Sequence, residues 1–164
     1  MSSEVEPVVI RPMTGADLDQ VLAIAAGLKE APQWPRSVYE GIVNAVEGGF
    51  GPPRRIALVA CDADSGSVAG FAVASLMPPE GEVETVGVVS EFQRRGVGRR
   101  LVNEIGKIFR VRGITKVLLE VRDSNLAAKA LYGSLGFKEM FRRANYYVDP
   151  IEDAVLMCLD LPEK

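Results

Sequence analysis

The chain of 164 residues has 48% hydrophobic and 25% charged residues, which suits a globular protein with one core, so we expect a single domain spanning residues 1–164. Its formal net charge of −3 disfavours nucleic acid as a partner, because nucleic-acid binders usually carry a dominant basic face. The absence of histidine excludes Ser-His-Asp and Cys-His nucleophile pairs, and two distant cysteines make no zinc cluster, so we expect no metal.

The first third of the chain predicts one strand and two helices. The opening segment Met1–Pro7 is polar and acidic, unlike a signal peptide, which favours the cytoplasm. A short strand (8–13), a helix with Thr14 as its N-cap (14–28), a second helix (35–49) and a turn (50–53) follow.

The remaining two thirds predict strands interrupted by two helices. The strands cover 55–61, 67–76, 83–89, 115–122, 136–148 and 153–161, and the helices cover 97–111 and a segment beginning near Asn125. This order predicts an α/β (α+β) protein whose mixed, mostly antiparallel seven-stranded sheet carries helices on both faces. No apolar run reaches the roughly 20 residues that a membrane span needs, so we expect no membrane association.

The stretch EFQRRGVGRRLVNEI (91–105) joins a predicted strand to a predicted helix. Gly96 and Gly98 permit positive φ and close backbone approach where the unpaired N–H groups of a helix start favour an anion. The neighbouring arginines would add charge-assisted hydrogen bonds. The spacing matches neither common nucleotide-binding motif, and a glycine turn with solvated arginines explains the local pattern equally well.

The context of this stretch is more specific. A Gln93-x-x-Gly96-x-Gly98 turn between a strand and a helix resembles the acetyl-CoA-binding motif of the GCN5-related N-acetyltransferase (GNAT) superfamily. The segment SNLAAKALYGSLGFKE (124–139) and the order of elements over nearly the whole chain fit the same family. The resemblance implies the GNAT fold and acetyl-CoA as cosubstrate. The cofactor-binding residues that it implies are Val86, Val88, Gln93, Arg94, Arg95, Gly96, Val97, Gly98, Arg99, Asn125 and Tyr132.

Two further segments, LEVRDSNLAAKALYGSLGF (119–137) and RRANYYVDPIEDAVLM (142–157), resemble bacterial ribosomal-protein alanine N-terminal acetyltransferases and related protein N-terminal acetyltransferases. This implies a protein N-terminus as acceptor, with ribosomal protein S18 as the family's bacterial substrate. Two departures leave the acceptor open. APQWPRS (31–37) stands where relatives often carry Pro-Trp-Ser, and Thr85–Val88 reads Thr-Val-Gly-Val where Asn-Ile-Ala-Val is common. The sequence also leaves monomer and homodimer open.

Acetyl transfer from a thioester to an amine needs a neutral amine, a stabilised oxyanion and a leaving thiolate. An α-amine, with a pKa near 8, costs about 3 kcal/mol less to deprotonate at neutral pH than a lysine with a pKa near 10.4. A site without histidine therefore suits an α-amine.

The catalytic candidates are Glu120 and Tyr132, which match the family's base and acid. Glu120 ends the run VLLE and would take the proton of the amine directly or through water, with Glu82 and Glu84 as rivals. Tyr132, seven residues after Asn125, would face the same side of a helix and donate to the departing thiolate. A backbone N–H near Val88 would stabilise the oxyanion.

The expected acceptor-binding residues are Trp34, Glu84, Tyr146 and Tyr147. Consecutive strand residues face opposite sides, so at most one of the two tyrosines should touch the peptide. Two other functions remain open. One is acetylation of a small amine, such as a polyamine, which would favour a strongly acidic cleft, an amino sugar or a free amino acid. The other is a non-catalytic CoA-binding regulatory module, which would need neither Glu120 nor Tyr132.

Overall fold

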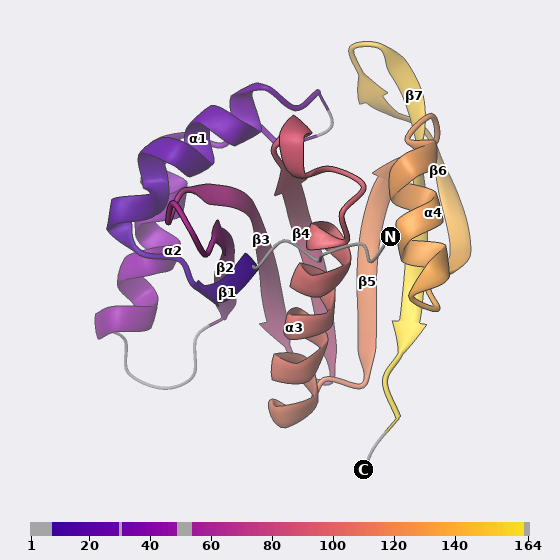
Figure 1. Ribbon diagram of the computed structural model, residues 1–164. Coiled ribbons are helices and arrows are strands. Elements are labelled where there is room, and N and C mark those ends of the chain that lie inside the picture. The colour runs from indigo at the N-terminus through magenta and orange to yellow at the C-terminus, as the bar shows by residue number, and fades with distance from the viewer. Residues whose placement is uncertain (1–7, 30, 49–53, 163–164) are drawn as a thin grey trace, which may run out of the picture.

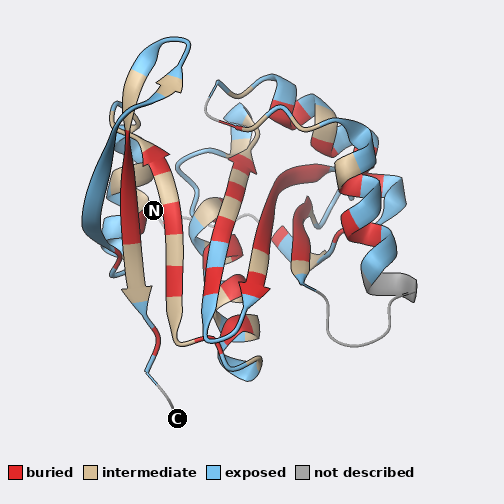
Figure 2. Ribbon diagram, turned by 180° about the vertical axis from the view of Figure 1, so that it is seen from behind, coloured by how far each residue is buried: buried red, intermediate tan, exposed pale blue. Residues whose placement is uncertain are grey.

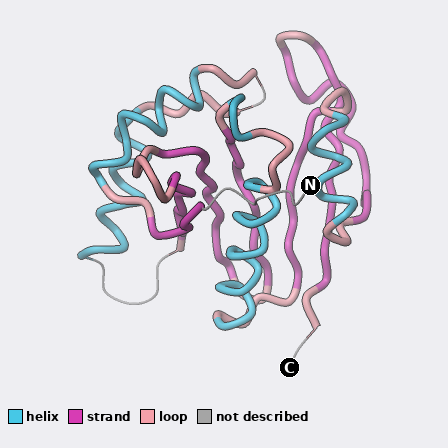
Figure 3. Tube along the Cα trace, viewed as in Figure 1, coloured by secondary structure: helices cyan, strands magenta, loops and turns pink. Residues whose placement is uncertain are grey.

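The computed structural model describes residues 8–29, 31–48 and 54–162. The acidic segment Met1–Pro7 and the turn expected at Phe50–Pro53 lie outside these residues. The described elements follow the predicted order (Figure 1; Figure 3). They are β1 (Val8–Pro12), α1 (Leu18–Ala26), α2 (Arg36–Gly48), β2 (Arg55–Asp62), β3 (Val68–Met77), β4 (Glu80–Val88), α3 (Val97–Val111), β5 (Lys116–Arg122), α4 (Leu126–Ser134), β6 (Lys138–Val148) and β7 (Ile151–Asp160).

The start of the first helix differs from the prediction. A 3₁₀ turn at Gly15–Asp17 precedes α1, so the α-helix begins at Leu18 instead of just after Thr14. The reason is local, because the carboxylate of Asp17 bonds back to the N–H of Thr14 at 2.8 Å. Two nitrogens of Arg11 hold the same carboxylate at 2.8 Å each, which fixes the tight turn.

The seven strands form one mixed sheet in the order β1-β2-β3-β4-β5-β7-β6. Only β4 and β5 run parallel, and every other neighbouring pair is antiparallel, as the sequence predicts. Helices α1 and α2 cover one face, and α3 and α4 cover the other (Figure 1). We call these the α1–α2 face and the α3–α4 face. Among the described residues, no helix is long and apolar enough to cross a bilayer.

Strands β2 and β3 are buried on both faces (Figure 2). In β2, Ile56 and Leu58 pack toward α3, whereas Ala57 and Val59 pack toward α1 and α2. This alternation explains why β2 and β3 are nearly continuous apolar runs in the sequence.

The sheet is open between its two parallel strands. β4 and β5 pair only where Glu80–Glu82 meets Lys116–Leu118. Two residues later β4 bulges, since Val73 and Ala74 of β3 face Thr85 and Val83, and Glu84 is the extra residue. We call the gap that follows, between Val83–Val88 and Leu119–Arg122, the seam.

Candidate active site

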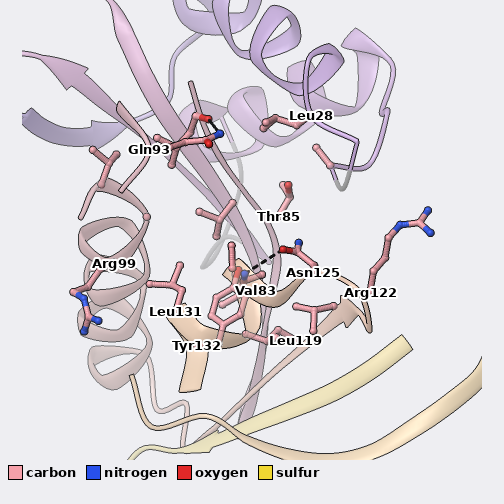
Figure 4. A pocket seen from close by; sticks show the side chains of 18 of the residues that line it. Leu28, Val83, Thr85, Gln93, Arg99, Leu119, Arg122, Asn125, Leu131 and Tyr132 are labelled. Carbon is pink, nitrogen blue, oxygen red and sulfur yellow. Dashed lines mark hydrogen bonds between the residues drawn. The ribbon is translucent and has the colours of Figure 1, made fainter. Parts of the chain in front are cut away.

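One cavity of about 640 Å³ fills the seam (Figure 4). All of the predicted site residues except Arg95, Trp34 and Tyr146 line it. The lining residues among the predicted set are Glu84, Val86, Val88, Gln93, Arg94, Gly96, Val97, Gly98, Arg99, Glu120, Asn125, Tyr132 and Tyr147. The seam therefore brings together side chains from both faces of the sheet.

The glycine turn lies on the α3–α4 face of this cavity. Arg94 and Gly96 have positive φ values of 65° and 81°, and Gly96 is the N-cap of α3. The first N–H groups of an α-helix have no partner within the helix, so this turn aims backbone donors and the positive end of α3 at one place. The side chain of Gln93 donates to the carbonyl of Val88 at 3.0 Å and braces the turn against β4.

Helix α4 forms the neighbouring wall. The carboxamide oxygen of Asn125 accepts from the N–H of Ala128 at 3.1 Å and caps the helix, as the dashed line in Figure 4 marks. Tyr132, two turns later, also lines the cavity, so the expected shared face is present. Tyr132 is buried, and this burial raises the pKa of its phenol to about 12.

The carboxylates lie toward the α1–α2 face. Glu120 is partly exposed, and an oxygen of its carboxylate lies 3.8 Å from Nη1 of Arg143. Glu84 is held by Arg55, whose Nε and Nη2 donate to its two oxygens at 2.9 and 2.7 Å. Desolvation and then the negative charges of Glu84 and Glu120 raise the pKa of Glu82, which does not itself line the cavity.

Tyr146 and Tyr147, which are neighbours in β6, have different environments. Tyr147 lines the cavity, with the guanidinium of Arg122 4.1 Å from its ring centroid. Burial and the negative charge of Glu120 raise the pKa of Tyr147. Tyr146 is 47% exposed and packs edge-on against Tyr147. One tyrosine lines the cavity and the other does not, but their rings are in contact and so do not lie on opposite faces of β6, whose pairing with β7 is irregular between Arg143 and Tyr147.

The whole site offers backbone donors for an anion on one face and carboxylates on the other, joined through a gap in the sheet. The profile of the acetyltransferase (GNAT) family matches residues 23–137. The chain belongs to the acetyltransferase (GNAT) family.

Several members of this family are similar to the chain. N-alpha-acetyltransferase RimI of Mycobacterium tuberculosis is 34% identical over 98% of this chain and 97% of that protein. The [ribosomal protein bS18]-alanine N-acetyltransferase of Escherichia coli K12 is 40% identical over 59% of this chain and 67% of that protein. The crystal structure of the Escherichia coli ribosomal-protein-S18-alanine N-acetyltransferase superposes with a TM-score of 0.80 and 29% identity, covering 96% of each chain.

The structure accounts for one departure of this GNAT member from its relatives. Gly87 stands where Ala is common, and a Cβ there would lie 2.7 Å from Cε1 of Phe71 and 3.0 Å from Cδ1 of Leu28. Phe71 is fully buried, so its ring occupies the space that an alanine methyl would need.

Sequence reasoning missed other residues of this site. The lining residues Leu28, Thr85, Leu119 and Leu131 belong to no sequence motif, and neither does Arg122. Arg55 was not singled out, because its partner Glu84 lies 29 residues away and only strand pairing brings them together. Arg95 lies 5.5 Å from the ring centroid of Phe92, and Trp34 lies beneath Arg55 at the same distance.

Proposed function

We propose that this GNAT acetyltransferase transfers the acetyl group of acetyl-CoA to the N-terminal α-amine of a protein, with ribosomal protein S18 as the first acceptor to try. The observation that carries the reaction is the single cavity through the seam, which joins the glycine turn to Glu120. The names of its full-length and S18-specific relatives support the α-amine as acceptor.

The residues of the glycine turn fit acetyl-CoA. Positive φ at Arg94 and Gly96 shapes a concave run of backbone that leads into the start of α3. Arg94 and Arg99 add positive charge at the rim, and Nη2 of Arg99 bonds Ser134 of α4 at 2.5 Å. We assign the pyrophosphate to this turn and the pantetheine arm to the side of Asn125.

We place the acceptor on the α1–α2 face of the cavity, where Glu120 lies, so that Glu120 would receive the proton of the amine directly or through water. Tyr132 lines the same cavity, and we assign to its hydroxyl the role of hydrogen-bond donor to the departing thiolate. A backbone N–H near Val88 would stabilise the oxyanion.

Initial-rate CoA release with a panel of acceptors tests this function. The panel holds short peptides with different first residues, one peptide with a blocked N-terminus and a free lysine, spermidine and free amino acids. We expect turnover of Ala- or Ser-starting peptides that is lost on blocking the α-amine. Turnover of small amines alone would refute the N-terminal assignment, and tight CoA binding without any turnover would favour a regulatory module.

A further inference from the structure

A three-part contact joins β2, β4 and the loop before α2 on the α1–α2 face. Arg55, at the start of β2, forms the two-point hydrogen bond with Glu84 at 2.9 and 2.7 Å. The same guanidinium lies over the indole of Trp34, 5.5 Å from the ring centroid. One side chain thus links a carboxylate that lines the cavity to an aromatic ring that does not.

Trp34 belongs to an aromatic stack behind the wall of the cavity. Its ring centroid lies 5.6 Å from that of Tyr39, which lies 6.2 Å from that of Phe71. Phe71 in turn fills the space above Gly87 of β4. The stack therefore runs from Arg55 through the core and returns to the strand that borders the seam.

Trp34 lies in the segment between α1 and α2, next to a residue that hydrogen-bonds this segment. Gln33, the residue before Trp34, donates from its side-chain amide to three carbonyls of this segment. The segment also supplies Leu28, Ala31 and Pro32 to the cavity lining. These contacts connect Trp34, through its neighbour Gln33, to the segment that forms this wall of the cavity.

We propose that Arg55 is a positioning residue for the acceptor: it holds Glu84 at the cavity, anchors Trp34, and so sets the distance between the α1–α2 loop and β4. This inference rests on the proposed function only in that the acceptor enters from the α1–α2 face. Acetyl-CoA affinity should not depend on Arg55, because the glycine turn and Tyr132 lie on the other face.

Trp34 provides a spectroscopic readout, since it is the only tryptophan in the chain. An acceptor that contacts Glu84 or the loop changes the contact between Arg55 and the indole. We therefore expect the intrinsic emission to change on titration with acceptor peptide and to stay constant on titration with CoA alone.

The experiment compares Arg55→Gln, Arg55→Lys and the control Arg54→Gln, which removes the same charge from the exposed neighbouring residue. In Arg55→Gln we expect the KM for peptide to rise about tenfold, with kcat and the Kd for acetyl-CoA within about twofold of wild type. Arg55→Lys keeps the positive charge but loses the planar guanidinium, so its KM for peptide should lie between those of wild type and Arg55→Gln. Arg54→Gln should match wild type.

Three results would overturn the proposal: an unchanged peptide KM in Arg55→Gln, a parallel loss of acetyl-CoA affinity, or a wild-type KM in Arg55→Lys. Thermal unfolding of each variant separates a folding defect from a change in KM. If wild type instead acetylates a small amine, the proposed function fails, and the same comparison of KM and kcat with that amine still tests Arg55.

Discussion

The two halves of the cavity are built in different ways. The half on the α3–α4 face comes mainly from one continuous stretch, 86–99, together with α4, and it relies on backbone geometry and apolar packing. The half on the α1–α2 face relies on charged side chains brought together from distant strands, such as Arg55 with Glu84 and Arg143 with Glu120. The first half is readable from local sequence, and the second depends on the register of the sheet.

The largest effect that we expect tests whether the chemistry depends on the acceptor half. Glu120→Gln should lower kcat by about 10²- to 10³-fold, because it removes the proton acceptor, while acetyl-CoA affinity measured by calorimetry stays near wild type. Glu82→Gln is the matched control and should cost less than tenfold. The opposite ranking would assign the base to Glu82.

A substitution in the α3–α4 half of the cavity should lower kcat less. Tyr132→Phe should lower kcat by about 10- to 100-fold, because the leaving sulfur loses a hydrogen-bond donor. A pKa of about 12 means that the phenol stays protonated as the pH rises to about 11. The wild-type kcat profile should therefore show no falling limb between pH 8 and 10, and a limb there that Tyr132→Phe removes would contradict this assignment.

Gly87→Ala tests the packing that connects the halves. The new methyl would lie 2.7 Å from the buried ring of Phe71 and 3.0 Å from a methyl of the partly buried Leu28, so we expect the free energy of unfolding to fall by about 1–3 kcal/mol in urea denaturation. Gly106→Ala, in α3 with nothing within 4 Å of its Cβ position, should instead be neutral or stabilising. An unchanged free energy of unfolding in Gly87→Ala would show that the contact with Phe71 does not explain the glycine.

The smallest effect concerns the glycine turn. Gly96→Ala places a side chain at a φ of 81°, which costs about 1–2 kcal/mol and should weaken acetyl-CoA binding about fivefold. Gly66→Ala imposes the same strain at a φ of 75° in the hairpin loop far from the cavity. Both variants should lose similar stability, but only Gly96→Ala should change the Kd for acetyl-CoA. A loss of affinity in both would assign the effect to global destabilisation.

Local patterns predict most of the fold. Helix α3 spans Val97–Val111, the range that its apolar spacing predicts, and Asn125 caps α4 where the sequence places its start. The mixed, mostly antiparallel sheet also follows from the pattern of elements, whereas the position of β7 between β5 and β6 does not. These features depend on periodicity, caps and turns, which act within a few residues of one another.

The features that the sequence does not predict depend on contacts between residues that lie far apart in the sequence. The bulge at Glu84 arises from how β4 pairs with β3, and no residue type near Glu84 marks it. Trp34 was expected in the acceptor site, yet Arg55 covers its ring and it lies behind the cavity wall. A contribution of Trp34 to acceptor binding stays a prediction, and we now expect Trp34 to act indirectly, through its contact with Arg55.

The seam divides the chain as well as the sheet. Strands β1 to β4 with α1, α2 and α3 are continuous in sequence from Val8 to Val111, and β5, β6, β7 and α4 follow from Lys116 to Asp160. The backbone pairing between β4 and β5, which joins these two pieces, consists of three residue pairs. On heating, we expect the protein to open first along this line, and a ligand bound in the cavity should raise the melting temperature by holding both pieces together.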